Sequence, residues 1–187
     1  MDTATAVLRK EHEAILKMLA VTEEVARRLE AGEQVTVETL ANLLEFFRLF
    51  ADKCHHGKEE DLLFPELEKK GMPRTGGPIW VMLAEHNQGR KLVQQMAEAT
   101  EAYPNQPGTA APAWAQAARG YVALLRAHID KENNVLFVMA ERMLTPDEQT
   151  ALAESFERIE VEKMGAGTHE RLHSMMAKLI KEILPAP

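Results

Sequence analysis

The sequence predicts an all-α protein: an up-down-up-down four-helix bundle with an additional C-terminal fifth helix. Hydrophobic residues recur at helical spacing along nearly the whole chain, and the alternating Val, Ile and Thr patterns of strands are missing. Turn signals fall at only four places. They separate segments of about 25 to 35 residues, each about 40 to 50 Å long as a helix, and long helices with short connections favour a bundle.

The first three turns set the order of the bundle helices. The first helix begins near Thr3 and ends at residues 31–34 (AGEQ). The second begins near Thr36 and ends at residues 69–78 (KKGMPRTGGP). A loop at residues 103–112 (YPNQPGTAAP) separates the third helix from the fourth.

A capping box starts the fifth helix. In the stretch LTPDEQ, Thr145 occupies the N-cap, Pro146 the first helical position and Glu148 the third position after the cap. We therefore expect residues 1–145 to form the bundle and residues 146–187 to form a C-terminal helix packed on it.

Composition restricts the class of protein. With 187 residues, 45% of them hydrophobic, the chain can bury one sizeable core. Its 22 basic and 29 acidic residues are interspersed and give a net charge of −7, without the basic stripe that tracks nucleic acid. No apolar run reaches the roughly 20 residues of a membrane span, the N-terminus lacks an uninterrupted apolar signal core, and the single Cys54 fits a reducing compartment. We expect a cytoplasmic protein without nucleic-acid or membrane partners, either alone or as a homodimer.

Both halves of the chain carry the same histidine pattern. In each half a Glu-His pair comes first and a His-x-x-x-Glu motif follows, 43 residues after the first single histidine and 42 after the second. Two similar helical hairpins, related by an approximate two-fold axis, would bring these residues together. The six candidate ligands are His12, His55, Glu59, His86, His128 and Glu132.

These six residues interrupt apolar seams that run at three- and four-residue steps. The four seams are Leu8, His12, Ile15, Leu19; Leu44, Phe47, Ala51, His55, Glu59, Leu62; Ile79, Leu83, His86, Arg90, Val93; and Tyr121, Leu125, His128, Glu132, Val135, Met139. Buried, unpaired carboxylates cost several kcal/mol, and the seams offer only Arg90 as a compensating protein charge. Metal ions would supply the missing positive charge.

The donor count predicts two metal ions. If Glu59 and Glu132 each bridge both ions, each ion receives two carboxylate oxygens and two imidazole nitrogens, and a shared solvent oxygen leaves one further position open. The residual positive charge favours a bridging hydroxide or oxide. Mixed nitrogen and oxygen donors suit iron, with manganese or zinc as alternatives, whereas structural zinc more often uses cysteines.

Two residue pairs in the first motif compete for the same roles. Alignment of the Leu-Phe endings of the two motifs selects His55 over His56 and Glu59 over Glu60. His56 and Glu60 share a helix face with Asp52, which we interpret as a solvated edge. Their alternative role is to orient a ligand imidazole through a hydrogen bond.

The C-terminal helix carries further candidates. His169 lies on its apolar stripe with Ile159, Leu172, Met176 and Leu179, and the simplest interpretation is that this helix covers the bundle. Alternatively, Glu160, Glu162 or His169 reaches the mouth of the centre and completes or gates the open position. Cys54 points away from the neighbouring ligand and is interpreted as a small buried residue.

The motifs resemble those of the hemerythrin family, in particular its HHE cation-binding branch, which includes proteins that repair iron centres. The resemblance rests on Glu11-His12, HxxKEExxLFP at residues 55–65, EHxxGR at residues 85–90 and HxxxENNVLF at residues 128–137. It covers most of residues 3–144 and implies a hemerythrin-like bundle with an oxo- or hydroxo-bridged di-iron centre. The functions it implies range over O2 binding, NO or peroxide response, iron handling and iron-sulfur repair.

The sequence departs from oxygen-carrying hemerythrins at two positions. Those proteins use five histidines, one of them four residues after the third-helix ligand, where this chain has Arg90. They also place Asp one residue beyond the position of Glu132. The centre should therefore be poorer in nitrogen, which argues against reversible O2 carriage. We hypothesise that Arg90 orders a carboxylate or a bound anion.

These observations predict a non-haem di-iron protein that binds or senses a small diatomic or peroxide ligand, or that handles iron for storage or iron-sulfur repair. One alternative is an enzyme that turns over peroxide or NO at the same centre. The other is a structural module whose metals hold the bundle together. Whether the protein is an enzyme is left open by the sequence.

Overall fold

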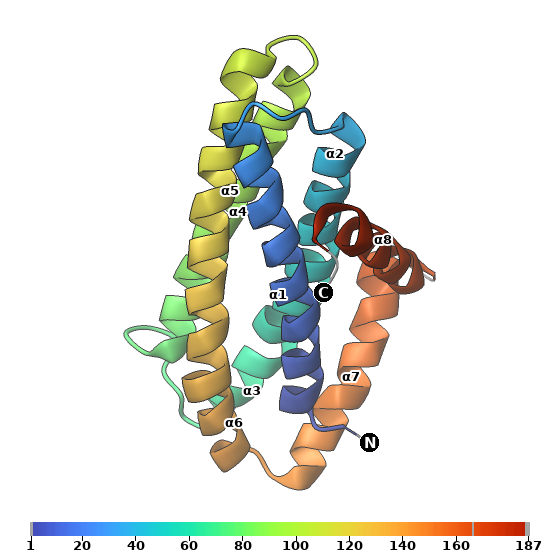
Figure 1. Cartoon of the computed structure of the whole chain (residues 1–187). Coiled ribbons are helices and arrows are strands. Elements are labelled where there is room, and N and C mark those ends of the chain that lie inside the picture. Colours follow the sequence, from blue (N-terminus) through green and yellow to red (C-terminus); the bar gives the residue numbers. More distant parts are fainter. Residues whose placement is uncertain (1, 166, 186–187) are drawn as a thin grey trace.

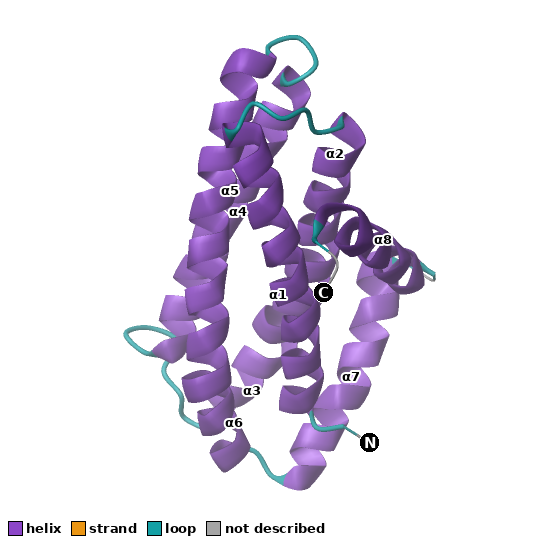
Figure 2. Cartoon of the chain, viewed as in Figure 1, coloured by secondary structure: helices purple, strands orange, loops and turns teal. Residues whose placement is uncertain are grey.

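The computed structural model describes residues 2–165 and 167–185, which form helices and turns with no strand among them (Figure 2). The first half contains α1 (Ala4–Glu30), α2 (Val37–Phe46), η1 (Phe47–His56), η2 (Glu59–Leu63) and α3 (Phe64–Lys69). The second half contains α4 (Pro78–Ala102), α5 (Pro107–Lys131), η3 (Glu132–Leu136) and α6 (Phe137–Met143). The C-terminal part contains α7 (Pro146–Met164) and α8 (Thr168–Ile183). The all-α prediction is confirmed.

The three η segments are π-helical, and they continue the neighbouring α-helices without a loop. The segments from α2 to α3 therefore form one long helical rod, and those from α5 to α6 form another. In Figure 1 the α1–α2 and α4–α5 loops lie at one end of the molecule, and the α3–α4 and α6–α7 loops lie at the other. Four rods lie side by side in this arrangement, and α7 and α8 pack against them.

Side-chain caps start three of the helices where the sequence predicts them. The Thr3 hydroxyl accepts a hydrogen bond from the main chain at the start of α1, and the Thr36 hydroxyl does the same at the start of α2. Thr145 and Glu148 form both bonds of the capping box at the start of α7. Each cap satisfies main-chain N–H groups that have no partner inside the helix.

The C-terminal part is two helices, and not the single fifth helix expected from the sequence. Gly165 and Gly167, between α7 and α8, have φ angles of 83° and 79°. These angles interrupt an α-helix, and glycine adopts them without steric cost. The break sends α8 across the bundle (Figure 1). Its buried residues are Leu172, Leu179 and Ile183.

The loop between the third and fourth rods is shorter than the expected 103–112. Helix α5 already begins at Pro107 and includes Pro112. Pro112 has no N–H to donate to the carbonyl of Gly108 four residues before it. Gly108 is exposed, so its carbonyl can bond to water, and the helix continues through the proline.

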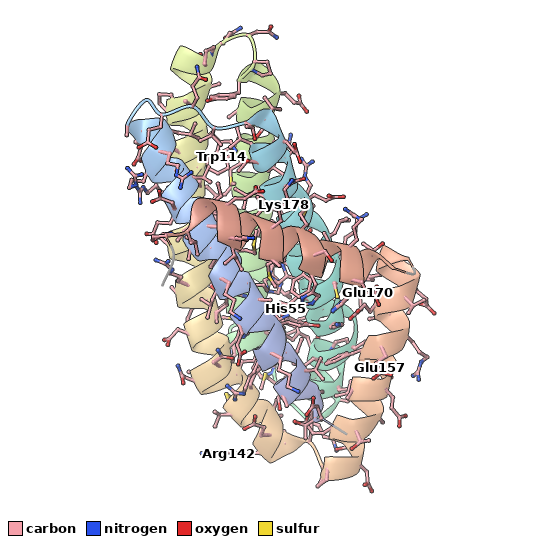
Figure 3. The ribbon with its side chains drawn as sticks, turned by 45° about the vertical axis from the view of Figure 1, so that its right-hand side comes forward. His55, Trp114, Arg142, Glu157, Glu170 and Lys178 are labelled. Carbon is pink, nitrogen blue, oxygen red and sulfur yellow. The ribbon has the colours of Figure 1, made fainter. Side chains whose placement is uncertain are left out.

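Two hydrophobic clusters fill the bundle, one on either side of the candidate ligands. Along α1, Leu8 belongs to one cluster and Ile15 to the other, and His12 lies between them. Along the last rod, Ile129 and Leu136 belong to different clusters in the same way. The candidate ligands therefore form a polar layer inside an apolar bundle. Figure 3 shows His55 near the middle of the molecule.

The π-helical turns shift the buried seam by one residue in both halves. The sequence seams place Leu62 and Val135 inside the bundle, but Val135 is 49% exposed and Leu62 is only partly buried. Leu63 and Leu136, one residue later, are 0% and 1% exposed. An i→i+5 turn contains one more residue than an α-turn, so the following side chains rotate out of α-helical register. The predicted seams are wrong at these two positions.

No helix among the described residues is both long enough and apolar enough to cross a bilayer.

Candidate metal centre

The structure brings all six candidate ligands into one buried layer, and it adds His56 to them. Each of the seven residues is at most 4% exposed. Their donor atoms form two groups, and within each group the atoms lie within 4.8 Å of one another. The first group is His12, His55, Glu59 and Glu132, and the second is His56, Glu59, His86 and His128. The two groups share Glu59.

Glu59 faces both groups with different oxygens. Its Oε1 lies 3.6 Å from Nε2 of His55, and its Oε2 lies 3.4 Å from Nε2 of His86. Both oxygens are buried and have no hydrogen-bond partner. One carboxylate in this position can bind two cations, one on each oxygen.

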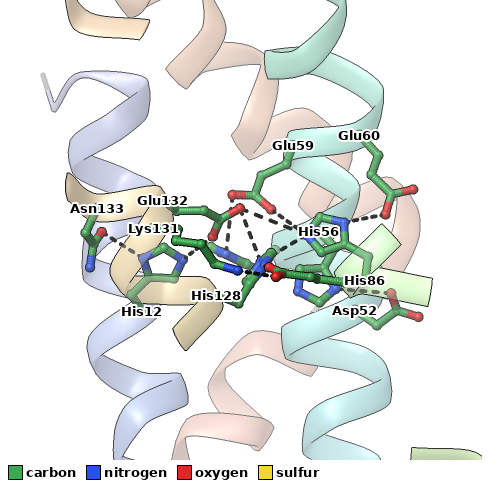
Figure 4. Close-up of polar contacts among 12 residues, drawn as sticks. His12, Asp52, His56, Glu59, Glu60, His86, His128, Lys131, Glu132 and Asn133 are labelled. Carbon is green, nitrogen blue, oxygen red and sulfur yellow. Dashed lines mark hydrogen bonds and ion pairs between the residues drawn. The ribbon is translucent and has the colours of Figure 1, made fainter. Parts of the chain in front are cut away.

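Glu132 has the corresponding position in the second half. Its Oε2 lies 3.2 Å from Nε2 of His12, and its Oε1 lies 3.2 Å from Nε2 of His128. In Figure 4, Glu59 and Glu132 lie between His12 on one side and His86 on the other. Both carboxylates therefore lie between the two histidine groups.

Hydrogen bonds at Nδ1 orient four imidazoles so that Nε2 faces the carboxylates. The Nδ1 partners are Asn133 for His12, Glu11 for His55, Glu60 for His86 and Glu85 for His128, at 2.9, 2.9, 2.7 and 2.9 Å. A neutral imidazole that donates from Nδ1 carries its lone pair on Nε2, which is the atom that binds a metal. The arrangement selects this tautomer for each ring.

Glu11 and Glu85 have roles that were not predicted from the sequence. Each accepts a hydrogen bond from the histidine of a His-x-x-x-Glu motif and forms an ion pair with the lysine three residues after that histidine, Lys58 or Lys131. The signal was present in the repeat, because both single histidines follow a Glu and both motifs read His-x-x-Lys-Glu. The two lysines differ in burial: the Lys58 side chain is 1% exposed and the Lys131 side chain 39%.

The interpretation of His56 as part of a solvated edge is wrong. Its ring is buried and stacks on His86 with 3.9 Å between centroids, and its Nδ1 lies 3.4 Å from an oxygen of Asp52. The prediction assumed α-helical spacing of about 100° per residue. In the π-helical η1 the angle between consecutive side chains is smaller, so His55 and His56 both face inward. The layer therefore holds five imidazoles, one more than the four expected from the sequence.

Glu60 and Arg90 lie directly behind the layer. Glu60 accepts hydrogen bonds from Nδ1 of His86 and from the Arg90 guanidinium, both at 2.7 Å. Arg90 also donates to Asp52 at 2.8 Å, so it orders two carboxylates, in line with the hypothesis from the sequence. Burial opposes the ionisation of Glu60, but His86 and Arg90 outweigh it and lower its pKa to about 2.

The candidates on the C-terminal part do not enter the ligand layer. Glu160 forms ion pairs with Lys58 at 2.7 Å and with His169 at 2.6 Å, so it contacts residues behind His55. Glu162 is exposed on α7. Cys54 is buried beside Glu160, and burial and Glu11 raise the pKa of its thiol to about 12. Cys54 is therefore buried, as the sequence predicts, and its thiol is protonated at neutral pH.

The inward-facing atoms fit a pair of metal ions. Nε2 of His12 and His55 and all four oxygens of Glu59 and Glu132 are buried without a hydrogen-bond partner. Nε2 of His86 lies 3.1 Å from Nε2 of His128. Two nitrogens bound at right angles to one ion, with bonds of about 2.1 Å, would be about 3 Å apart. The donor set, its spacing and its unsatisfied lone pairs all correspond to bound cations.

The pKa values of the buried layer also indicate that its carboxylates need nearby positive charge to be ionised. Burial, together with the nearby Glu132 carboxylate, raises the pKa of Glu59 well above its ordinary value. Burial opposes the protonation of His128, but Glu132 and Glu85 outweigh it and raise its pKa to about 9. Without other cations, these groups therefore retain protons. Metal ions and protons compete for the same sites.

The chain is similar to two groups of known proteins. It is 26% identical over 181 residues to an uncharacterized protein of Mycobacterium tuberculosis, which covers 97% of this chain and 70% of that protein. It is 39% identical over 90 residues to the iron-sulfur cluster repair protein YtfE of Salmonella newport, which covers 46% of this chain and 40% of that protein. No solved structure matches it at a significant level.

The sequence model of the hemerythrin HHE cation-binding domain matches residues 3–140. This match contains the Glu-His pairs, both His-x-x-x-Glu motifs and His56, and it ends before α7. It therefore includes every residue of the buried layer. On the strength of this match and of the site that it covers, the chain belongs to the hemerythrin HHE cation-binding domain family.

Proposed function

We propose that this protein is a cytoplasmic, non-haem di-iron protein of the hemerythrin-like type. The observation that carries the proposal is Glu59, which is shared by two groups of donor atoms and has two buried, unpartnered oxygens. We assign residues 1–145 to an up-down-up-down bundle that holds the metals and residues 146–187 to a part packed on it. The alternating loop ends in Figure 1 support this order.

We assign the ligands by the two groups. His12 and His55 would hold one ion, His56, His86 and His128 would hold the other, and Glu59 and Glu132 would be shared between them. The absence of a thiolate from both groups favours iron, with manganese or zinc as the alternatives. When bound, the iron pair would supply redox chemistry and coordination positions for a small ligand. The protein holds the imidazoles by their Nδ1 bonds, so that all lone pairs converge without rearrangement.

The role we propose is to bind or sense a small ligand such as O2, NO or peroxide, or to handle iron for storage or iron-sulfur repair. Support comes from the likeness to a protein named for iron-sulfur cluster repair. Support also comes from the donor count, because five imidazoles and two carboxylates leave coordination positions of two six-coordinate ions free for a ligand.

Metal analysis and an absorption spectrum of the freshly purified protein test the metal assignment. We expect two irons per chain and charge-transfer bands of an oxygen-bridged pair. A single zinc and a colourless protein would contradict the proposal. As a matched pair, Glu59→Gln should lose iron, whereas Glu157→Gln, on the exposed face of α7, should retain it.

Addition of peroxide or NO to the metal-loaded protein separates binding from turnover. A binding or sensing protein should change its spectrum with about one equivalent and consume no more. Consumption of many equivalents would support the alternative of an enzyme. A metal spectrum that no small ligand perturbs would support a structural role for the metals.

A further inference from the structure

The residue after the glutamate of each His-x-x-x-Glu motif supports a histidine in the other half of the chain. Glu60 accepts a hydrogen bond from Nδ1 of His86 at 2.7 Å, and Asn133 accepts one from Nδ1 of His12 at 2.9 Å (Figure 4). The two positions correspond, but one side chain is a carboxylate and the other an amide. The two halves therefore fix the tautomers of these histidines by different means.

An amide is an ambiguous partner for an imidazole. An ionised carboxylate can only accept, so Glu60 by itself requires a proton on Nδ1 of His86. The amide of Asn133 can accept through its oxygen or donate through its nitrogen. If it turned its nitrogen toward His12, Nδ1 would have to accept, and the proton would lie on Nε2. In that tautomer Nε2 has no lone pair for a metal ion.

The interior of the layer favours this second tautomer of His12. Oε2 of Glu132 lies 3.2 Å from Nε2 of His12, and both atoms are buried without a hydrogen-bond partner. When no metal ion lies between them, a proton on Nε2 would let His12 donate to this carboxylate, and such a bond is stronger than one to a neutral amide. The amide of Asn133 therefore needs a further contact that keeps its oxygen toward His12.

Arg9 supplies this contact. It lies on α1 one turn before His12, and its guanidinium donates to the main-chain oxygen of Asn133 at 2.6 Å and to Oδ1 of the same residue at 3.4 Å. A guanidinium has no acceptor, so a reversed amide would place its NH2 group against another donor. The buried ring of Phe137 contacts both side chains, because His12 stacks on it and the Arg9 guanidinium lies 5.4 Å from its centroid. These contacts hold Arg9 beside the amide oxygen.

We propose that Arg9 is a positioning residue that keeps His12 in its metal-binding tautomer by fixing the amide of Asn133. The inference rests on the proposed function, in which Nε2 of His12 holds a metal ion. Arg90 contacts Glu60 in the corresponding place, at 2.7 Å. There the arginine only balances charge, because the carboxylate already fixes the tautomer.

A double-mutant cycle on the metal-loaded protein tests this role. Arg9→Met should weaken retention of the ion assigned to His12 about tenfold or more in competition with a chelator, because only part of the protein then holds the competent tautomer. Loss of charge alone would have the opposite effect, since removal of a nearby positive charge strengthens cation binding. In the Asn133→Asp background, where the side chain can only accept, Arg9→Met should have little effect.

Arg119→Met is the matched control. Arg9 forms an ion pair with Glu141 at 3.2 Å, and Arg119 forms one with Glu30 at 2.7 Å. Each substitution therefore removes one positive charge and one ion pair at the surface. Arg119→Met should retain both metal ions as firmly as the unaltered protein does.

Nitrogen-15 NMR of histidine-labelled protein, after removal of metal, detects the tautomer directly. At alkaline pH, where imidazoles are uncharged, we expect the proton of His12 on Nδ1 in the unaltered protein and on Nε2 in a large fraction of Arg9→Met. The signal of His12 is the one that His12→Gln lacks. Because this measurement needs no metal, it tests the role of Arg9 separately from the proposed function.

Two results would overturn the proposal. One is an equal effect of Arg9→Met on metal retention in both backgrounds, including no effect in either, which would show that the amide is not what Arg9 acts on. The other is an unchanged tautomer of His12 in Arg9→Met. A tautomer shift in a protein that binds no metal would refute the proposed function alone. A metal pair with an unchanged tautomer would refute the role of Arg9 alone.

Discussion

The five buried imidazoles are not held equally firmly. Four of them have Nδ1 partners at 2.7 to 2.9 Å, whereas the bond between His56 and Asp52 is 3.4 Å long. A bond of this length constrains the ring weakly. His56 also lines a cavity beside the centre. Of the five imidazoles, His56 should therefore dissociate most easily from a bound metal ion.

Substitution of His56 by Ala should therefore weaken the binding of one metal ion and leave the binding of the other unchanged. We expect the ion assigned to His86 and His128 to be removed by a chelator that leaves the unaltered protein fully loaded, because one of its three nitrogens is lost. Elemental analysis after dialysis against graded chelator concentrations measures this. His173→Ala, an exposed histidine on α8, is the control and should keep both ions. Unchanged metal retention in His56→Ala would exclude His56 as a ligand.

Lys58 and Lys131 allow the stabilities of a buried and an exposed ion pair to be compared within one molecule. Each pairs with the Glu of a Glu-His pair, but only Lys58 is buried. Lys58→Met should lower the free energy of unfolding by about 3 kcal/mol, because it leaves Glu11 buried without its cation. Lys131→Met should cost less than about 1 kcal/mol, because solvent screens an exposed pair. Denaturant unfolding of both variants measures this difference. Equal losses in the free energy of unfolding would show that burial does not determine the strength of these ion pairs.

At the scale of elements, the π-helical segments coincide with the ligand motifs. Segment η1 contains His55 and His56, η2 begins at Glu59 and η3 begins at Glu132. A π-turn widens the helix locally and changes where the following side chains point. Without it, two consecutive histidines would diverge, and only one would reach the centre. The widened turns thus increase the number of donors that one helix can supply.

The break between α7 and α8 depends on left-handed glycines. Gly167→Ala should destabilise the protein by about 1 to 2 kcal/mol, because its φ of 79° is unfavourable for a residue with a Cβ. Gly108→Ala, in the first turn of α5, has free space around the added carbon and should be neutral or slightly stabilising. Thermal unfolding of both variants checks this prediction. Equal stability of the two would mean that the α7–α8 junction relaxes without strain.

At the scale of the whole molecule, α7 and α8 pack against α1 and against the rod that carries the first His-x-x-x-Glu motif. Glu160 closes the Glu11–Lys58 pair on the first half, and the corresponding Glu85–Lys131 pair on the second half remains partly exposed. A cavity of about 250 Å³ between α1, η1, α7 and α8 reaches Glu11. The C-terminal part thus protects the residues behind His55.

Removal of residues 168–187 should leave the number of metal ions unchanged, because all seven proposed ligands lie before residue 133. It should accelerate metal loss to a chelator and increase the reactivity of Cys54, since the ion pair between His169 of α8 and Glu160 beside Cys54 is lost. Metal analysis, chelator kinetics and alkylation rates measure the three effects. Loss of all metal from a folded, helical truncated protein would show that the C-terminal part completes the centre.

The sequence by itself determined the long helices, their caps and the buried positions of six candidate ligands. Repetition at helical spacing carries this information, because residues three and four apart lie on one face of a helix whatever it packs against. The doubled His-x-x-x-Glu motif also selected His55 and Glu59 over their neighbours. Both lie in the layer, but His56 lies there too.

Only the tertiary structure decided the rest. His56 joins the layer because η1 is π-helical, and a periodic pattern read at α-helical spacing cannot reveal one inserted residue. Glu11 and Lys58 meet across two rods, more than 40 residues apart in the chain, so their partnership depends on how the rods are aligned. The break between α7 and α8 depends on the positive φ angles of Gly165 and Gly167. Glycine permits such angles but does not require them, so the sequence alone does not show where they occur. Local periodicity specifies what lies inside each helix, whereas helix register and packing decide which inward-facing groups meet.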